Sequence, residues 1–233
     1  GPALLLISLA KETGAVLWQR GLDTGNQYHR KHNLAPPSPV TDGKNVWVVA
    51  GTGMVLAFDM EGEQLWRKNL QELYGPFGLI FGYAASPLLF DDKLVIEVLH
   101  GYKTDDPSYL VAFDALSGDV KWHQERPTDA VKESPDAYTT PTLIRRNGKS
   151  EIVVSGADYV TGHDPDTGAE LWRIAGLNPE KEGNYRVVGS PVAGPTSPPT
   201  TSPKKTVWSP GWLLSTTLHS TQPTAEFRTG APV

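Results

Sequence analysis

A turn that leads into a tryptophan recurs four times along the chain and constrains its fold more than any other feature. Each copy has a short apolar segment, a turn closed by glycine and a second segment that ends at Trp18, Trp66, Trp122 or Trp172. The tryptophans follow one another at about 50 residues, a period typical of repeat architectures in which each unit covers its neighbour. The pattern therefore predicts a stack of equivalent units.

In three of the copies an aspartate precedes the glycine of the turn. Its carboxylate can accept local backbone N–H groups, while glycine adopts the positive φ that closes a tight turn. The tryptophan is large and apolar with a single donor, which suits it to fill the gap between neighbouring units. We interpret all of these as structural repeat residues: Trp18, Asp59, Gly62, Trp66, Asp114, Gly118, Trp122, Asp164, Gly168 and Trp172.

A second marker, Ser or Thr followed by Pro, keeps the same period. Proline lacks a ladder donor and therefore belongs at the first residue of a strand or on an edge. The short apolar segments between the two markers predict four strands in each unit. The predicted fold is all-β, a partial β-propeller of four-stranded blades within residues 1–194. It contains a partial blade at 4–22, blades at 38–70, 86–126 and 140–175, and the start of another at 190–194.

The last part of the chain breaks this pattern. Residues 195–233 are rich in Pro, Thr and Ser and poor in apolar periodicity, which predicts an irregular or disordered tail. One short strand is conceivable around Trp208, Trp212 and Leu213-Leu214.

The repeat resembles that of a known family. The pattern Ala-Phe-Asp-x-x-x-Gly-x-x-x-Trp, as in Ala112 to Trp122, is similar to the tryptophan-docking repeat of pyrroloquinoline-quinone (PQQ) propellers, also called quinoprotein alcohol dehydrogenase-like propellers. The resemblance covers about residues 4–194. Besides dehydrogenases, the family includes the propeller lipoprotein of the outer-membrane β-barrel assembly machinery and secreted proteins without an assigned activity. It implies a ring of seven or eight blades, so the remaining blades of the same propeller are expected partners.

Dehydrogenases of this family hold PQQ and Ca²⁺ on the propeller axis with a catalytic Asp, metal ligands, a stacking Trp and often an adjacent Cys pair. This chain has no cysteine, and its repeat carboxylates are explained as turn formers. We therefore expect no catalytic residue, metal or cofactor in this stretch, and a binding or scaffold module. The alternative is a fragment of a PQQ- and calcium-dependent alcohol or sugar dehydrogenase.

Two connections between blades are candidate binding loops, because such loops carry function in repeat folds. The first is basic and contains Tyr28, His29, Arg30 and His32. Its two imidazoles and its cations could bind an anion or a partner's carboxylate. The alternative is an ordinary solvated loop without a binding role. The second is aromatic, and the alternative there is packing against neighbouring loops. Its candidate residues are Tyr74, Phe77, Phe81 and Tyr83.

Charge and hydropathy narrow the classes of partner. The net charge is −5 with no long run of one sign, which argues against a nucleic-acid partner. No segment has the length and apolar character of a transmembrane helix. The chain opens inside a predicted strand and without Met, as an excised fragment would. We expect a protein or small-ligand partner on the inter-blade loop face, and a periplasmic or extracellular location.

Overall fold

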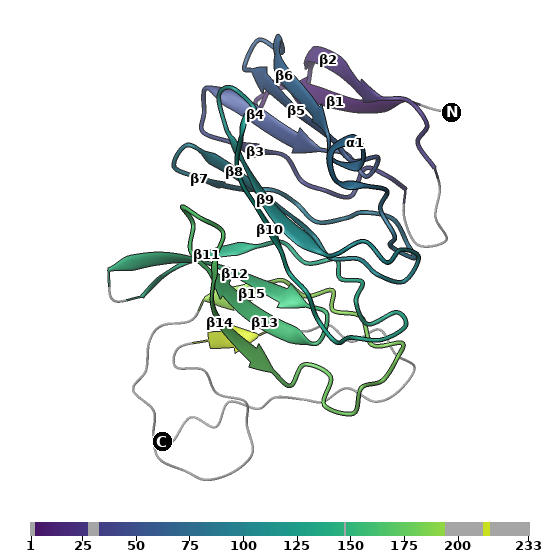
Figure 1. Ribbon diagram of the computed structural model, residues 1–233. Helices are drawn as coiled ribbons and strands as arrows, with labels where there is room; N and C mark the ends of the chain where they lie inside the picture. Colours follow the sequence, from purple (N-terminus) through teal and green to yellow (C-terminus); the bar gives the residue numbers. More distant parts are fainter. Residues whose placement is uncertain (1–2, 28–32, 147, 194–211, 215–233) are drawn as a thin grey trace, which may run out of the picture.

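The computed structural model describes residues 3–27, 33–146, 148–193 and 212–214, and they form a series of antiparallel sheets (Figure 1). The first sheet has two strands, β1 (Leu4–Leu9) and β2 (Val16–Asp23). Three four-stranded sheets follow. They are β3 (Val40–Thr41), β4 (Asn45–Val49), β5 (Met54–Asp59) and β6 (Gln64–Asn69); β7 (Leu88–Phe90), β8 (Lys93–Val98), β9 (Tyr109–Asp114) and β10 (Val120–Glu125); and β11 (Thr142–Arg146), β12 (Lys149–Gly156), β13 (Tyr159–His163) and β14 (Glu170–Ala175). The fifth sheet pairs β15 (Pro191–Ala193) with β16 (Trp212–Leu214).

Within each complete sheet the strands pair in chain order, so every sheet is a simple meander. These observations confirm the predicted all-β fold of four-stranded blades. Among the described residues the one helix is the short α1 (Leu70–Tyr74), which the repeat pattern did not predict. Its N-cap is Asn69, whose side chain accepts a hydrogen bond from Gln71 N at 3.0 Å. None of the helical segments described here has the length and apolar character needed to cross a bilayer.

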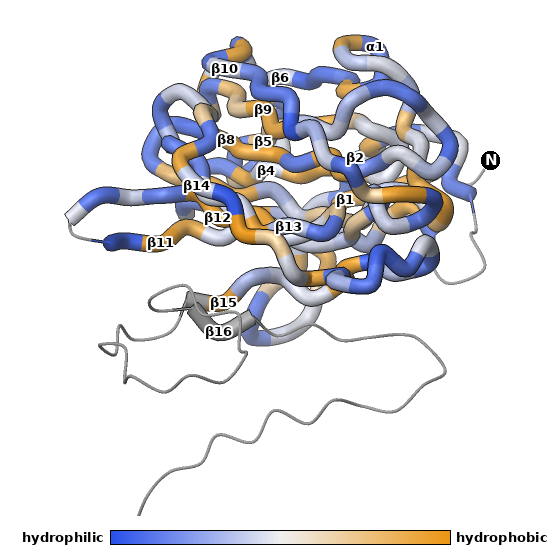
Figure 2. The backbone as a smooth tube through the Cα atoms, turned by 60° about the horizontal axis from the view of Figure 1, so that its bottom comes forward, coloured by the Kyte–Doolittle hydropathy of each residue, from blue (hydrophilic) through white to orange (hydrophobic). Residues whose placement is uncertain are grey.

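The middle strands of the β3–β6 and β7–β10 blades are mostly apolar on both faces, because both faces are covered. In β5 and β9 every residue except the final aspartate is buried. The outer strands β6 and β10 are largely exposed, and each buries its tryptophan. Figure 2 shows the hydrophobic segments concentrated on the inner strands of the stack. Such continuous apolar runs are expected where a sheet lies between two neighbours.

The blades follow one another in chain order along an open arc (Figure 1). Separate apolar clusters lie at successive blade–blade contacts. Leu22, Val48 and Phe58 belong to the cluster between the first sheet and the β3–β6 blade. Trp66 and Phe113 belong to the next cluster, whose buried residues come mainly from the β3–β6 and β7–β10 blades. Because no blade covers its own faces, the stack supplies the core.

The Ser/Thr-Pro markers connect the first strands of adjacent blades. The backbone N–H of each of the first three markers donates to the marker hydroxyl of the following blade. The bonds run from Ser38 N to Ser86 Oγ (2.9 Å), from Ser86 N to Thr140 Oγ1 (3.1 Å) and from Thr140 N to Ser190 Oγ (2.9 Å). We call this series the marker relay.

Candidate binding surface

The two ends of the blades are built differently. One end, here called the turn face, carries the tight hairpin turns at 10–15, 59–63, 114–119 and 164–169. The opposite end, the loop face, carries the longer connections at 70–87, 99–108, 126–141 and 176–189 (Figure 1). Each end therefore has to be judged separately as a site.

On the turn face, tryptophans link one blade to the next. Each indole N–H donates to a backbone carbonyl in the turn of the following blade, and each ring lies over that turn's glycine. A Cβ added at Gly118 would meet the Trp66 ring at 2.7 Å, so only glycine fits there. The three bonds run from Trp18 to Met60 O (2.8 Å), from Trp66 to Ala115 O (2.9 Å) and from Trp122 to Pro165 O (3.0 Å).

The repeat carboxylates lie inside the same turns. Asp114 Oδ1 accepts from the N–H groups of Leu116 and Ser117 at 3.0 and 2.9 Å. The Ser117 N–H bond is the main reason why the pKa of Asp114 is lowered. Asp59 and Asp164 accept backbone N–H groups of their own turns in the same way. These carboxylates are therefore engaged in turn formation.

Trp172 departs from the docking pattern. Its indole N–H donates to Glu151 Oε2 of the same blade at 2.6 Å. Its ring covers Gly162, where an added Cβ would collide with the indole. The two earlier blades have Ala57 and Ala112 at the position paired with the tryptophan, so the glycine here makes room for the ring.

The loop face is held together by a buried carboxylate, Asp136. Its two oxygens accept from Ile80 N at 2.7 Å and from Tyr102 N at 3.1 Å. One side chain thereby joins three connections, 70–87, 99–108 and 126–141. Burial raises the pKa of Asp136 to about 6, although the backbone N–H bonds act in the opposite direction.

The aromatic loop packs closely onto this face. Tyr83 is 1% exposed and donates to Glu97 O at 3.0 Å, so its ring does not reach the surface. Phe77 stacks on Tyr83 with ring centroids 5.0 Å apart. Tyr74 stacks on His123 at 4.3 Å. The aromatic loop thus packs against its neighbours at Tyr83 and, in large part, at Phe77, as the alternative interpretation expects.

Phe81 and Arg186 form a second, half-buried part of the loop face. The Arg186 guanidinium lies over the Phe81 ring, 5.2 Å from its centroid, and pairs with Glu133. Tyr138 is beside Phe81 at 6.3 Å, and its hydroxyl accepts from Phe81 N at 3.3 Å. Three successive connections thus contribute to one surface that carries an aromatic ring and a cation.

Other predicted candidates fall outside this surface. The basic residues Tyr28, His29, Arg30 and His32 lie outside the described residues, as does most of the tail. Within the tail, β16 contains Trp212 and Leu213-Leu214, where a short strand had been considered. Across the part of the chain that the structure describes, no three His, Asp or Glu side chains are grouped in a way that could hold a metal ion.

Sequence reasoning missed Asp136 and Arg186. Both lie in connections between blades, outside the repeat pattern. No local motif distinguishes Asp136 from an exposed loop aspartate, because its partners Ile80 and Tyr102 are more than thirty residues away in sequence. Only its position shortly before the Thr140-Pro141 marker, at the start of a blade, hinted at burial.

The fold and the tryptophan docking together define a class of protein, the β-propellers built from PQQ-like repeats. A family model described as "Outer membrane protein assembly factor BamB" matches residues 5–200, and the chain belongs to this family. No curated protein sequence matches the chain significantly.

Solved structures agree with the fold. A europium-containing methanol dehydrogenase is 12% identical with a TM-score of 0.55, covering 77% of this chain and 39% of its own. A quinohemoprotein alcohol dehydrogenase from Comamonas testosteroni is 15% identical with a TM-score of 0.54, covering 82% and 35%. BamB from Moraxella catarrhalis is 17% identical with a TM-score of 0.46, covering 73% and 42%. The chain thus spans less than half of each of these proteins.

Proposed function

We propose that this chain is a binding or scaffold module of a periplasmic or extracellular propeller protein, with the loop face as its working surface. The observation that carries the proposal is the arrangement of Tyr74 and Phe81 on a connection that Asp136 holds in place, with the Arg186 guanidinium over the Phe81 ring. Aromatic rings and arginine are the side chains most often found at the energetic centre of interfaces. A surface fixed before binding loses little conformational entropy when a partner docks.

Support for this class of function also comes from the family, whose model bears the name of an assembly factor. The proposed partner is a protein or a small ligand with a polar group for the Arg186–Glu133 pair and an apolar group for the rings. We also propose His29 and Arg30 of the basic loop as binding residues. They lie outside the described residues, so this part of the proposal rests on the sequence alone.

The experiment compares partner capture by three immobilised forms of the chain from a periplasmic extract. We expect Tyr74→Ala combined with Phe81→Ala to reduce capture by about tenfold, because each removes a ring from the surface. Leu116→Ala is the matched control, since Leu116 is 68% exposed but lies on the turn face. Equal capture by all three forms would remove the loop face from the interface. Retention of PQQ with Ca²⁺, and dye reduction with alcohols or sugars, would favour the dehydrogenase alternative instead.

A further inference from the structure

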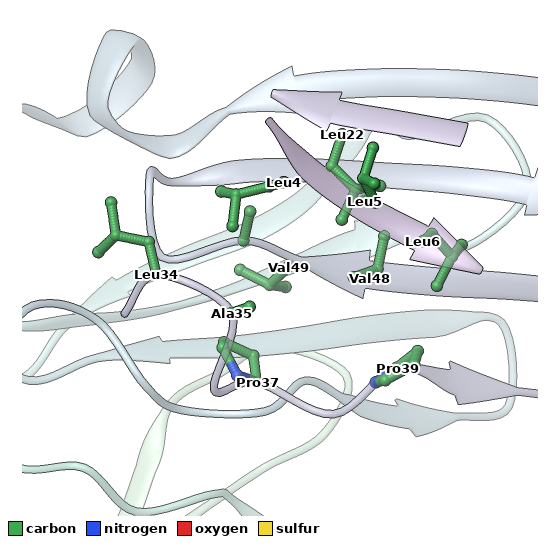
Figure 3. Close-up of a pocket in the computed structure, with 11 residues that line it drawn as sticks. Leu4, Leu5, Leu6, Leu22, Leu34, Ala35, Pro37, Pro39, Val48 and Val49 are labelled. Carbon is green, nitrogen blue, oxygen red and sulfur yellow. The ribbon is translucent and has the colours of Figure 1, made fainter. Parts of the chain in front are cut away.

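Two surface features of the described chain lie away from the loop face, and they differ in chemistry. An apolar groove of about 160 Å³ lies beside β1, and its lining includes Leu4, Leu6, Pro39 and Val48 (Figure 3). All of its lining side chains are apolar, so the groove has no group that would select one partner over another. The second feature is a projecting hairpin whose charge defines the partner that it fits.

The hairpin between β11 and β12 is longer than its counterparts in the other blades. β11 and β12 have five and eight residues, whereas β3 and β4 have two and five, and β7 and β8 have three and six. The third strand of the blade, β13, pairs with β12 only from Ile152 onward. The pairs Arg145–Ser150 and Arg146–Lys149 therefore form a two-stranded projection beyond the sheet. Both Figure 1 and Figure 2 show this hairpin extending past the rest of its blade.

Three of the four residues in these two end pairs are cationic. Arg145 and Lys149 are exposed, and of the three cations only Arg146 has an ion pair within the described part of the chain, with Glu151 at 3.1 Å. Arg146 and Lys149 also lie directly opposite each other. Like charges in that position destabilise an antiparallel strand pair. The projection thus carries more positive charge than its own folding uses, and the carboxylates of a partner would relieve the repulsion.

A buried carboxylate fixes the base of the projection. Glu151 Oε1 accepts from Arg146 Nε and Nη2 at 3.3 and 3.1 Å, and Glu151 Oε2 accepts from Trp172 Nε1 at 2.6 Å. The side chain of Glu151 is only 8% exposed, so water competes little for these bonds. The departure of Trp172 from the docking pattern therefore has a structural use, because its indole connects β14 to the hairpin. A hairpin held in this way loses little conformational entropy when a partner binds.

We propose that this basic hairpin, with Arg145, Arg146 and Lys149, is a docking site for an acidic segment of a protein partner. It is a second surface, separate from the loop face. β11 starts next to the 126–141 connection on the loop face, so its far end lies on the turn face. The planar guanidinium of arginine binds a carboxylate through two parallel hydrogen bonds, and lysine adds a mobile point charge.

The charge of the rest of the molecule favours a narrow acidic segment over an extended anionic surface. The chain has a net charge of −5. The turns of the turn face carry exposed carboxylates, among them Glu63, Asp119 and Asp166. A flat anionic bilayer would meet these carboxylates as well as the hairpin, and their repulsion would oppose binding. A projecting hairpin can contact a narrow acidic segment without bringing that segment close to the turns.

The test measures binding of the 233-residue chain to a short fluorescein-labelled peptide of alternating glutamate and serine, by fluorescence anisotropy at low ionic strength. We expect Arg145→Gln combined with Lys149→Gln to weaken binding by about tenfold, because the variant loses two charge-assisted contacts. Lys11→Gln combined with Lys44→Gln is the matched control. It removes the same charge from exposed turns of the same face and should bind as the unmodified chain does. The same peptide with glutamine in place of glutamate should not bind.

Vesicles of phosphatidylcholine with and without phosphatidylglycerol distinguish a membrane surface from an acidic peptide, and circular dichroism verifies that both variants are folded. Peptide binding that only the hairpin variant loses, without vesicle binding, supports the proposal. An equal loss in both variants would show that net charge alone is responsible and would overturn it. Absence of peptide binding, or hairpin-dependent binding to anionic vesicles alone, would overturn it too. Capture through the loop face is measured with other variants, so the two proposals stand or fail separately.

Discussion

The hydroxyl oxygen of Thr139 lies 2.7 Å from Glu97 Oε1 and also 2.7 Å from the carbonyl oxygen of Ser155. A hydroxyl has one hydrogen, so it can donate to only one of the two. If it donates to Ser155 O, a protonated Glu97 completes the arrangement by donating to Thr139. Burial raises the pKa of Glu97 to about 8, with the Thr139 bond and the Arg126 charge acting in the opposite direction. A neutral carboxylic acid therefore joins the β7–β10 and β11–β14 blades at pH 7.

This arrangement predicts that the free energy of unfolding falls as the pH rises from the unfolded pKa of Glu97 to its folded pKa. The folded-state pKa of Glu97 lies above its unfolded value of 4.5, so the native protein binds the extra proton. Its stabilisation is complete below pH 4.5 and is lost as the pH rises through 8. We expect unfolding free energy to fall by about 3 kcal/mol between pH 6 and pH 9, at about 1.4 kcal/mol per pKa unit.

Glu97→Gln should flatten this pH dependence, because an amide keeps the shape and does not titrate. Chemical denaturation at several pH values measures the free energy of unfolding of each form. Glu125→Gln on the exposed strand β10 is the control. The same loss between pH 6 and pH 9 in Glu97→Gln would show that another group is responsible.

Removal of one hydroxyl from the marker relay should destabilise the arc. Thr140→Val keeps the shape of the side chain but leaves the partly buried N–H of Ser86 without its acceptor. We expect a cost of about 1–2 kcal/mol, the typical penalty for a buried donor left unpaired. Thermal unfolding measures the change, with Thr24→Val on the exposed end of the first sheet as the control. If the two variants melt alike, the relay contributes nothing measurable.

The tryptophan docking predicts a difference between two glycines with similar backbone. Gly118 and Gly43 have φ of +74° and +86°, so alanine is strained by about 1–2 kcal/mol at either position. At Gly118 the new Cβ would also lie 2.7 Å from the Trp66 ring, whereas Gly43 has open surroundings. Gly118→Ala should therefore cost a further 1–3 kcal/mol or so through overpacking. Equal denaturation midpoints for the two variants would contradict the contact.

Asp136→Asn tests the clamp on the loop face. An amide has one acceptor oxygen, so one of the N–H groups of Ile80 and Tyr102 would face an NH₂ group instead. We expect a loss of about 2–3 kcal/mol, typical of hydrogen bonds to a charged group. Hydrogen exchange should speed up at Ile80 and Tyr102 while the turn face keeps its protection. Asp119→Asn, in an exposed turn, is the control, and unchanged exchange at Ile80 in Asp136→Asn would dismiss the clamp.

The repeat could be predicted from the sequence because its determinants are local. Asp114, Gly118 and Trp122 lie within nine residues, and their roles follow from turn chemistry and ring size. The order of strands within each blade follows from the short connections. The marker proline was assigned to a strand start, but its neighbouring hydroxyl was not recognised as a link to the next blade.

The loop face was predicted only in outline. Aromatic residues near Tyr74 were identified, but the burial of Tyr83 depends on Glu97, which lies in the following blade. The docking of Trp172 within its own blade follows from Gly162 and Glu151, neither of which belongs to the repeat signature. Long-range partners of this kind leave no periodic trace in a single sequence. The domain limits and the roles of the candidate binding residues stay predictions.

Each hydrogen bond of the marker relay is the same, and each joins one blade only to the adjacent blade. The contacts of one blade therefore do not determine the total number of blades. Blade number becomes a matter of curvature, since the turn between neighbours must add up to a full circle. Such a chain can gain or lose whole blades by duplication or deletion without any change to the contacts that define a blade, which gives the architecture a modular route to new sizes.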